Sequence, residues 1–239
     1  MNNSHIFQFQ SDISTTEIPT ELNNPLGSFI PEIAKIAAIE FQKLIEIESK
    51  NWGYDFDSEK GKMFGVLVIQ NQDNSYCYIA SVSGKLPNNI VCKHLVPSVF
   101  DESKSDYFLT KGMTELTEMG KRIGNSTNPA ELEELTKERA KKSYELQQQL
   151  FSHYQFLNIE GEEKNVLEIF ENYNKSTPPA AAGECAAPKL LQYALENNLK
   201  PIAIAEFWWG SQPGSNKKHR IFYPACKDRC KPILRFILD

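Results

Sequence analysis

The last third of the chain carries the pattern that most restricts its fold, because two cysteine-bearing helix starts are separated by one apolar strand. Cys185 comes just before a stretch with helical apolar spacing, and Cys226 and Cys230 open another. Residues 202–209 between them have the continuous apolar character of a buried strand. We therefore expect two helices around one strand, with Cys226 and Cys230 on one helical face because they lie four residues apart.

These three cysteines are candidate metal ligands. Thiolate is a soft ligand that Zn²⁺ binds tetrahedrally, and a helix N-terminus favours the thiolate form. With both helix starts at the carboxyl end of the sheet, Cys185, Cys226 and Cys230 would converge on a single zinc ion. The alternative is that they are ordinary buried small side chains, which free cysteine often is.

Chain length and cysteine usage limit the class of protein. A chain of 239 residues accommodates one domain with an insertion or two small domains, and its 41% apolar and 24% charged residues are ordinary for a soluble globular protein. Five cysteines without a framework spacing indicate a reducing compartment. The N-terminus lacks signal-peptide features, and no apolar run has membrane-spanning length. We therefore expect a cytoplasmic protein without a membrane partner.

The net charge of −5 is unevenly distributed along the chain. Residues 180–239 contain nine Lys or Arg and five Asp or Glu, whereas the preceding part is acidic. The cysteine-rich end is therefore the basic end, which favours an anionic partner there. The excess is too small for avid non-specific binding of nucleic acid.

Hydrophobic periodicity predicts an α/β fold with a small mixed sheet flanked by helices. A helix is expected over 31–50, and strands over 62–69 and 76–82 form an antiparallel hairpin. The helix–strand–helix order near the C-terminus implies a crossover, and hence a parallel pair beside that hairpin. The α/β core is expected to consist of residues 31–110 and 176–239.

Two further segments are expected outside the regular core. Residues 1–30 are rich in Asn, Ser, Thr and Pro, which predicts an extended N-terminal arm. Residues 111–175 are expected to form an inserted helical hairpin, made of helices over 129–156 and 166–173, that protrudes from the body. Its dense charges are interpreted as a solvated face. Residues 90–110 are expected to be irregular.

Two glutamates lie near the candidate ligands. Glu184 immediately precedes Cys185, where it could move protons for a zinc-activated water or complement the helix dipole. Glu206 interrupts the apolar strand, and we expect it at the exit of that strand in a structural pairing. Glu184 is therefore the candidate catalytic residue if the zinc site is a catalytic one.

A basic loop follows two tryptophans and is a candidate RNA-binding site. Trp208 and Trp209 could stack on unpaired bases while Lys217, Lys218 and Arg220 contact phosphates. The alternative is one tryptophan in the core next to a solvated loop.

Six segments from about residue 30 onward carry a family likeness: GKMFGVLVIQN, ASVSGKLPNN, LVPSVFD, GECAAPKLLQYA, KPIAIAEFWWG and FYPACKDRCKPIL. Together they resemble the N-terminal extension of certain bacterial RluA-type RNA pseudouridine synthases, and the last three are the most specific. The resemblance implies an accessory, non-catalytic module of RNA pseudouridylation, with rRNA or tRNA and a pseudouridine synthase catalytic subunit as partners. The catalytic Arg-Leu-Asp of that family is missing, and the chain stops at Asp239, where the catalytic domain would begin. We therefore expect a standalone protein or a split partner of such an enzyme.

The element order is also similar to the cytidine-deaminase-like fold. That resemblance implies Cys185, Cys226 and Cys230 as zinc ligands, and a zinc-dependent hydrolase acting on a nucleobase or nucleotide as the alternative function. Two departures bear on activity. Ala187 stands where that family has its catalytic acid, which leaves Glu184 on the other side of the ligand, and the cysteine pair is spaced by one residue too many.

Overall fold

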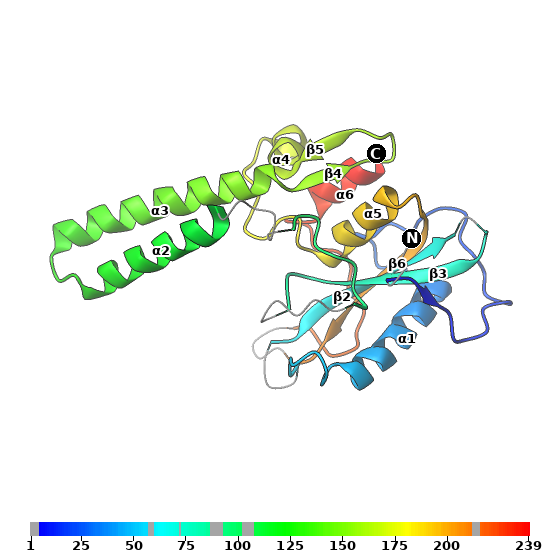
Figure 1. Cartoon of the computed structure of the whole chain (residues 1–239). Helices are drawn as coiled ribbons and strands as arrows, with labels where there is room; N and C mark the ends of the chain where they lie inside the picture. Colours follow the sequence, from blue (N-terminus) through cyan, green and yellow to red (C-terminus); the bar gives the residue numbers. More distant parts are fainter. Residues whose placement is uncertain (1–4, 57–59, 72, 87–92, 102–107, 212–215) are drawn as a thin grey trace.

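An antiparallel sheet forms the centre of the molecule (Figure 1). The computed structural model describes residues 5–56, 60–71, 73–86, 93–101, 108–211 and 216–239. Across the sheet, the order of the strands is β1 (Phe7–Gln8), β3 (Tyr76–Val82), β2 (Lys62–Gln70) and β6 (Lys200–Trp209). The predicted α/β class and the predicted hairpin of β2 and β3 are confirmed.

Helices cover both faces of this sheet (Figure 1). Side chains alternate along a strand, so Phe64 and Val66 of β2 pack on the first helix of the chain, whereas Leu67 packs on the opposite side with two helices from the C-terminal third. Two separate apolar cores result, one on each face. The three helices are α1 (Glu32–Glu48) on the first face, and α5 (Ala186–Glu196) and α6 (Lys231–Leu238) on the second.

The strand pairing differs from the sequence prediction in one respect. β6 pairs with β2 in antiparallel register, with Glu206 opposite Gly65, so the expected parallel pair is wrong. β2 lies between β3 and β6 and is antiparallel to both. β3 and β6 therefore run in the same direction, as the crossover implied. They are not neighbours, because β2 lies between them.

The N-terminal arm reaches both edges of the sheet. Its strand β1 pairs with the free edge of β3, and the side chain of Asn23 hydrogen-bonds to the backbone N–H and C=O of Ile204 at the edge of β6, at 2.8 and 3.1 Å. The backbone N–H groups of Gln10 and Ser11 donate to the buried carboxylate of Glu40 on α1. These contacts cover part of each edge, which leaves less exposed backbone that could pair with another chain.

A helical hairpin projects from the body (Figure 1), but its partners are not the predicted ones. The helix predicted from residue 129 packs against a helix that precedes it, because Gly112 leaves space for the side chain of Leu146. The helix predicted at 166–173 instead buries Ile169 and Phe170 in the second core of the body. The elements are α2 (Phe108–Asn125) and α3 (Pro129–Ser152) in the hairpin, then β4 (Gln155–Leu157), β5 (Glu163–Asn165) and α4 (Val166–Asn174).

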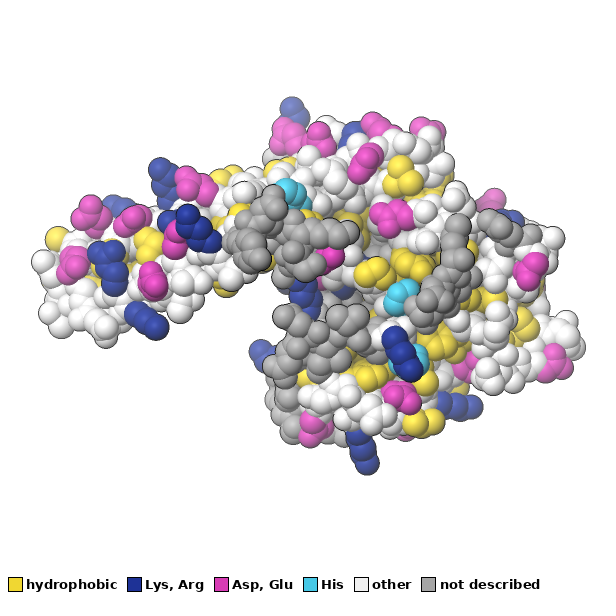
Figure 2. Space-filling model, viewed as in Figure 1, with side chains coloured by type: hydrophobic (Ala, Val, Ile, Leu, Met, Phe, Trp, Pro, Cys, Tyr) yellow, Lys and Arg dark blue, Asp and Glu magenta, His cyan; other side chains and the backbone are white. Residues whose placement is uncertain are grey.

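The charged surface of the hairpin carries both signs. Figure 2 shows acidic and basic side chains interspersed along it, and pairs such as Lys137 with Glu133 lie one helical turn apart. Exposed pairs of this kind contribute little to stability but keep a helix soluble. The pattern is that of a solvated face.

Candidate metal centre

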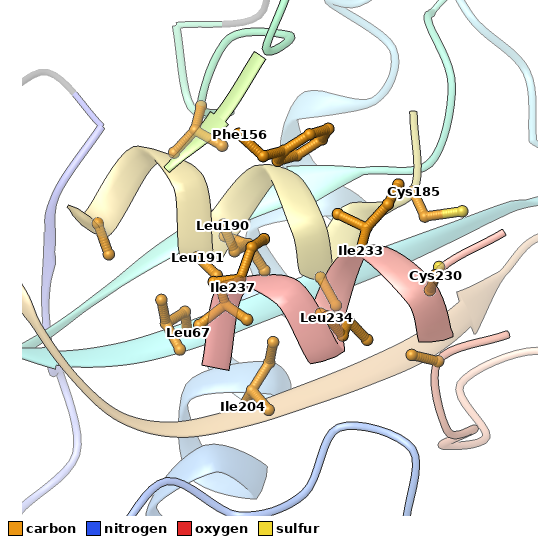
Figure 3. Close-up of a cluster of buried hydrophobic side chains, with 14 of the residues drawn as sticks. Leu67, Phe156, Cys185, Leu190, Leu191, Ile204, Cys230, Ile233, Leu234 and Ile237 are labelled. Carbon is orange, nitrogen blue, oxygen red and sulfur yellow. The ribbon is translucent and has the colours of Figure 1, made fainter. Parts of the chain in front are cut away.

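The three predicted cysteines lie together at the N-terminal ends of two helices. Cys185 is the N-cap residue of α5 and Cys230 is the N-cap residue of α6, and Figure 3 shows both at the same end of the helix pair. The sulfur of Cys226 lies 3.8 Å from that of Cys185 and 3.2 Å from that of Cys230. All three sulfurs lie within 4.8 Å of one another, so the predicted convergence is confirmed.

The route by which Cys226 reaches the cluster differs from the prediction. α6 begins at Lys231, so Cys226 precedes the helix and is joined to it by a turn over 227–230. The shared helical face predicted for Cys226 and Cys230 is therefore wrong. The turn folds the chain back so that both sulfurs still meet Cys185.

The spacing of the sulfurs fits a tetrahedral metal ion. Thiolates about 2.3 Å from a tetrahedral zinc lie about 3.8 Å from each other. The distance between Cys185 and Cys226 has this value, and the shorter distance between Cys226 and Cys230 would have to open by about half an ångström. All three are free thiols, and thiolate is the donor that zinc prefers over harder cations.

The three thiols do not share their protons equally. The pKa of the Cys226 thiol falls far below its usual value because its sulfur is hydrogen-bonded by Cys185, by Cys230 and by the backbone N–H groups of Arg229 and Cys230. The same contact with Cys226, together with burial, raises the pKa of Cys185 to about 12. It also raises the pKa of Cys230. These contacts favour ionisation of the exposed Cys226 over that of the two buried thiols.

Glu206 lies beside this cluster and was only partly anticipated. The residue is inside β6, three positions before its end, and is 6% exposed, so its predicted position at the strand's exit is wrong. Its side chain faces α5, where Oε1 accepts the backbone N–H of Ala187 at 3.1 Å. Burial raises its pKa to about 7, and the negative charge of Cys226 adds to this rise.

A glycine makes this close arrangement possible. Gly65 lies opposite Glu206 on β2, and a Cβ atom there would lie 3.0 Å from the side chain of Leu190 and 3.1 Å from that of Ala186. α5 can therefore approach the sheet closely enough for its first turn to hydrogen-bond to Glu206.

Glu184 contacts residues outside the cysteine cluster. Its carboxylate accepts a hydrogen bond from the hydroxyl of Tyr154 and forms an ion pair with Lys189, whose Nζ lies 3.2 Å away. Lys189 is 3% exposed and also donates to the carbonyl of Gly84, and its burial lowers its pKa. Sequence reasoning missed Tyr154 and Lys189, although a lysine within the apolar pattern of α5 was a visible signal.

The predicted RNA-binding residues form a layer over the end of β6. Trp208 and Trp209 are 7% and 5% exposed, so both rings belong to the interior. The ammonium of Lys217 lies 5.0 Å from the Trp208 ring centroid, and the guanidinium of Arg220 lies 5.1 Å from that of Trp209. Lys218 is exposed. In this arrangement the cations, and not RNA bases, occupy the ring faces.

Comparison with known proteins adds no relative, since no family model, curated protein or solved structure matches the chain. Within the described residues, no helix combines the length and the apolar character needed to span a bilayer.

Proposed function

We propose that this chain is a zinc-binding, non-catalytic accessory module of RNA pseudouridylation that works in the cytoplasm. The observation that carries the proposal is the thiol cluster formed by Cys185, Cys226 and Cys230. The three segments that most specifically resemble the RluA-type extension are residues 183–194, 200–210 and 222–234, which contain most of α5, the strand β6, and the turn that leads into α6. Two of these segments hold the three cysteines and the third holds Glu206, so the proposed likeness to that family is concentrated around this site.

A structural role for the metal is consistent with the positions of the ligands. Cys185 and Cys226 are 41 residues apart, and α6 would be tied to the N-terminus of α5 through them. Zinc would supply a cross-link between these elements, and structural zinc contributes ~10 kcal/mol in small domains. A cavity of about 430 Å³ at the base of the projecting hairpin is lined by Met113, Leu146 and Glu184 and by none of the three cysteines.

RNA contact is proposed through the backbone phosphates. Lys218 is exposed, and the C-terminal part of the chain that contains it has more basic than acidic residues. Stacking of a base on Trp208 would require the ammonium of Lys217 to move away from the face of that ring. Phosphate contacts by lysine carry no sequence information and weaken as salt rises. The rRNA or tRNA target and a synthase catalytic subunit as partner belong to this proposal.

Metal analysis of purified, reduced protein tests the zinc site. We expect about one zinc per chain, loss of that zinc in Cys185→Ser, and its retention in Cys77→Ser, a buried thiol elsewhere in the sheet that contacts Asn71. A chelator should lower the unfolding temperature of the wild type but not of Cys185→Ser. Protein that never binds zinc, although the three cysteines are reduced, would contradict the proposal.

A gel-shift titration with rRNA and tRNA tests the second part. Lys217→Ala combined with Lys218→Ala should weaken binding and flatten its salt dependence, whereas Lys137→Ala on the projecting hairpin should leave both unchanged. Absence of any shift at low salt would remove RNA from the proposal and leave the zinc site standing.

A second candidate, a zinc-dependent hydrolase acting on a nucleobase or nucleotide, is favoured by one specific observation. The residue at the position of the deaminase acid is Ala187, and the carboxylate of Glu206 is hydrogen-bonded to the backbone of that same residue. Zinc would supply a Lewis acid that activates water, and Glu206, with its raised pKa, could take up and release a proton near pH 7. Glu184 is held by Tyr154 and Lys189 and is the weaker candidate.

Ammonia release from cytidine or cytosine by zinc-loaded protein tests this candidate. Activity that is lost in Glu206→Gln and kept in Glu184→Gln would favour the hydrolase over the accessory module. Absence of ammonia release from the zinc-loaded wild type would leave the accessory module as the better description.

A further inference from the structure

The members of the thiol cluster differ sharply in their access to solvent. Cys226 is exposed, whereas Cys185 and Cys230 are 8% and 1% exposed. The sulfur of this exposed residue lies 3.8 Å from that of Cys185 and 3.2 Å from that of Cys230. An oxidant from solvent can therefore reach one sulfur that already has a second sulfur in contact.

We propose that the cluster is a reversible oxidation site, in which a hydroperoxide reacts at Cys226 and a disulfide then forms between Cys226 and Cys230. The oxidation step involves only the thiols of Cys226 and Cys230. Its effect on the metal rests on the zinc site proposed above.

The chemistry balances with a hydroperoxide as the two-electron oxidant. The Cys226 thiolate attacks one peroxide oxygen, so an S–O bond forms, the O–O bond breaks, and the second oxygen leaves as hydroxide or alkoxide and is protonated. The sulfur of Cys230 then attacks the sulfur of Cys226 as its own thiol proton is lost. An S–S bond forms, the S–O bond breaks, and the oxygen leaves as water. Two thiols lose two electrons, and the hydroperoxide is reduced to water and either water or an alcohol.

The local structure supports both steps. Cys226 is the member of the cluster that solvent reaches, which favours reaction with an oxidant at this residue. Cys226 belongs to the segment before α6 and not to the helix, so its side chain can move toward Cys230 without breaking helical hydrogen bonds. Cys230 is the nearer of the two buried sulfurs.

The expected consequence is loss of the metal. A disulfide removes two of the three thiolates, and the remaining one, Cys185, cannot hold zinc by itself. α6 would then be joined to its own preceding turn instead of to the start of α5. Oxidation would therefore release zinc and loosen the C-terminal helix, and reduction would restore both.

The test treats the full-length chain with hydrogen peroxide, both zinc-loaded and metal-free, and maps disulfides by mass spectrometry while a chromogenic chelator reports free zinc. We expect the tryptic peptides holding Cys226 and Cys230 to become joined, release of zinc in step with that bond, and reversal by dithiothreitol. In Cys226→Ser, oxidation of the remaining cluster thiols should slow by about tenfold or more, because both are buried. In Cys230→Ser, a sulfenic acid should persist at Cys226 and be trapped by dimedone.

Cys77→Ser is the matched control and should behave as wild type, and far-UV circular dichroism checks that each variant is folded. A bond to Cys185, or preferential oxidation of Cys77, would overturn the assignment. Protein that binds zinc yet forms no disulfide would refute the oxidation site alone. A disulfide in protein that never binds zinc would support the oxidation site and refute the zinc proposal.

Discussion

Replacing Glu206 by glutamine should stabilise the metal-free, reduced protein, and only above mildly acidic pH. Burial raises the pKa of this carboxyl from 4.5 to about 7 in the folded protein. At 1.36 kcal/mol per pKa unit, ionising Glu206 at pH 8 costs the folded state about 3 kcal/mol relative to the unfolded chain. A glutamine side chain at this position would carry no charge and would keep an oxygen that can accept the N–H of Ala187.

The sign of the pH dependence follows from the raised pKa. Below pH 4.5 the carboxyl is protonated in both states and carries no penalty. Between pH 4.5 and pH 7 the unfolded chain loses this proton before the folded chain does, so the stability of the wild type falls as pH rises. Above pH 7 the penalty is constant.

Urea unfolding at pH 4.5 and at pH 8, with a chelator and a reductant present, measures the effect. The free energy of unfolding of Glu206→Gln should exceed that of wild type by about 3 kcal/mol at pH 8 and by less than about 1 kcal/mol at pH 4.5. Glu171→Gln, at an exposed position on α4, is the control and should show no such difference. Equal stability at pH 8, or the same change at both pH values, would refute the reasoning.

Three further predictions concern stability and use the same unfolding assay. Gly65→Ala should destabilise by about 1–3 kcal/mol because its Cβ would press α5 away from β2, whereas Gly124→Ala, with open space around it on α2, should stabilise by up to about 1 kcal/mol. Asn23→Ala should cost about 1–3 kcal/mol because it leaves the N–H and C=O at the edge of β6 without their partner, and an effect below about 0.5 kcal/mol, the size of a neutral surface change, would contradict that role. Lys189→Met should lower the free energy of unfolding by about 3–5 kcal/mol because it leaves the carboxylate of Glu184 buried without its counter-charge. Adding Glu184→Gln to this variant should recover part of the lost stability. If the losses of the two single variants simply add, the two residues are not coupled.

Local sequence patterns were sufficient for the elements of the core. The apolar spacing of α1, the apolar runs of β2 and β3 and the turn residues between them reflect short-range preferences, and the structure has these elements where they were expected. The pairing of β6 with β2 depends on which face of each strand the helices cover. A local sequence pattern does not predict this pairing. α2 was missed because its apolar stripe, which packs mainly on α3, is narrow and lies among many exposed polar positions.

The difference between local sequence patterns and the assembled sheet also explains which parts of the candidate site were predicted. The cysteine spacing was sufficient to bring Cys185, Cys226 and Cys230 together in prediction, since helix starts around one strand meet at one end of a sheet. The position of Glu206 required the register with Gly65, which only the assembled sheet defines. The burial of Trp208 and Trp209 likewise depends on contacts made by the assembled fold, among them those of Lys217 and Arg220 with the two rings.

The arm that covers both sheet edges sets an order for events on the ribosome. Asn23 is made early, but the strand it covers contains Ile204, 181 residues later. At about 5–20 residues per second, synthesis of the intervening chain takes about 10–40 s. During that time the segment around Asn23 has no edge of β6 to contact, so its backbone and side chain stay open to other partners until β6 has been made.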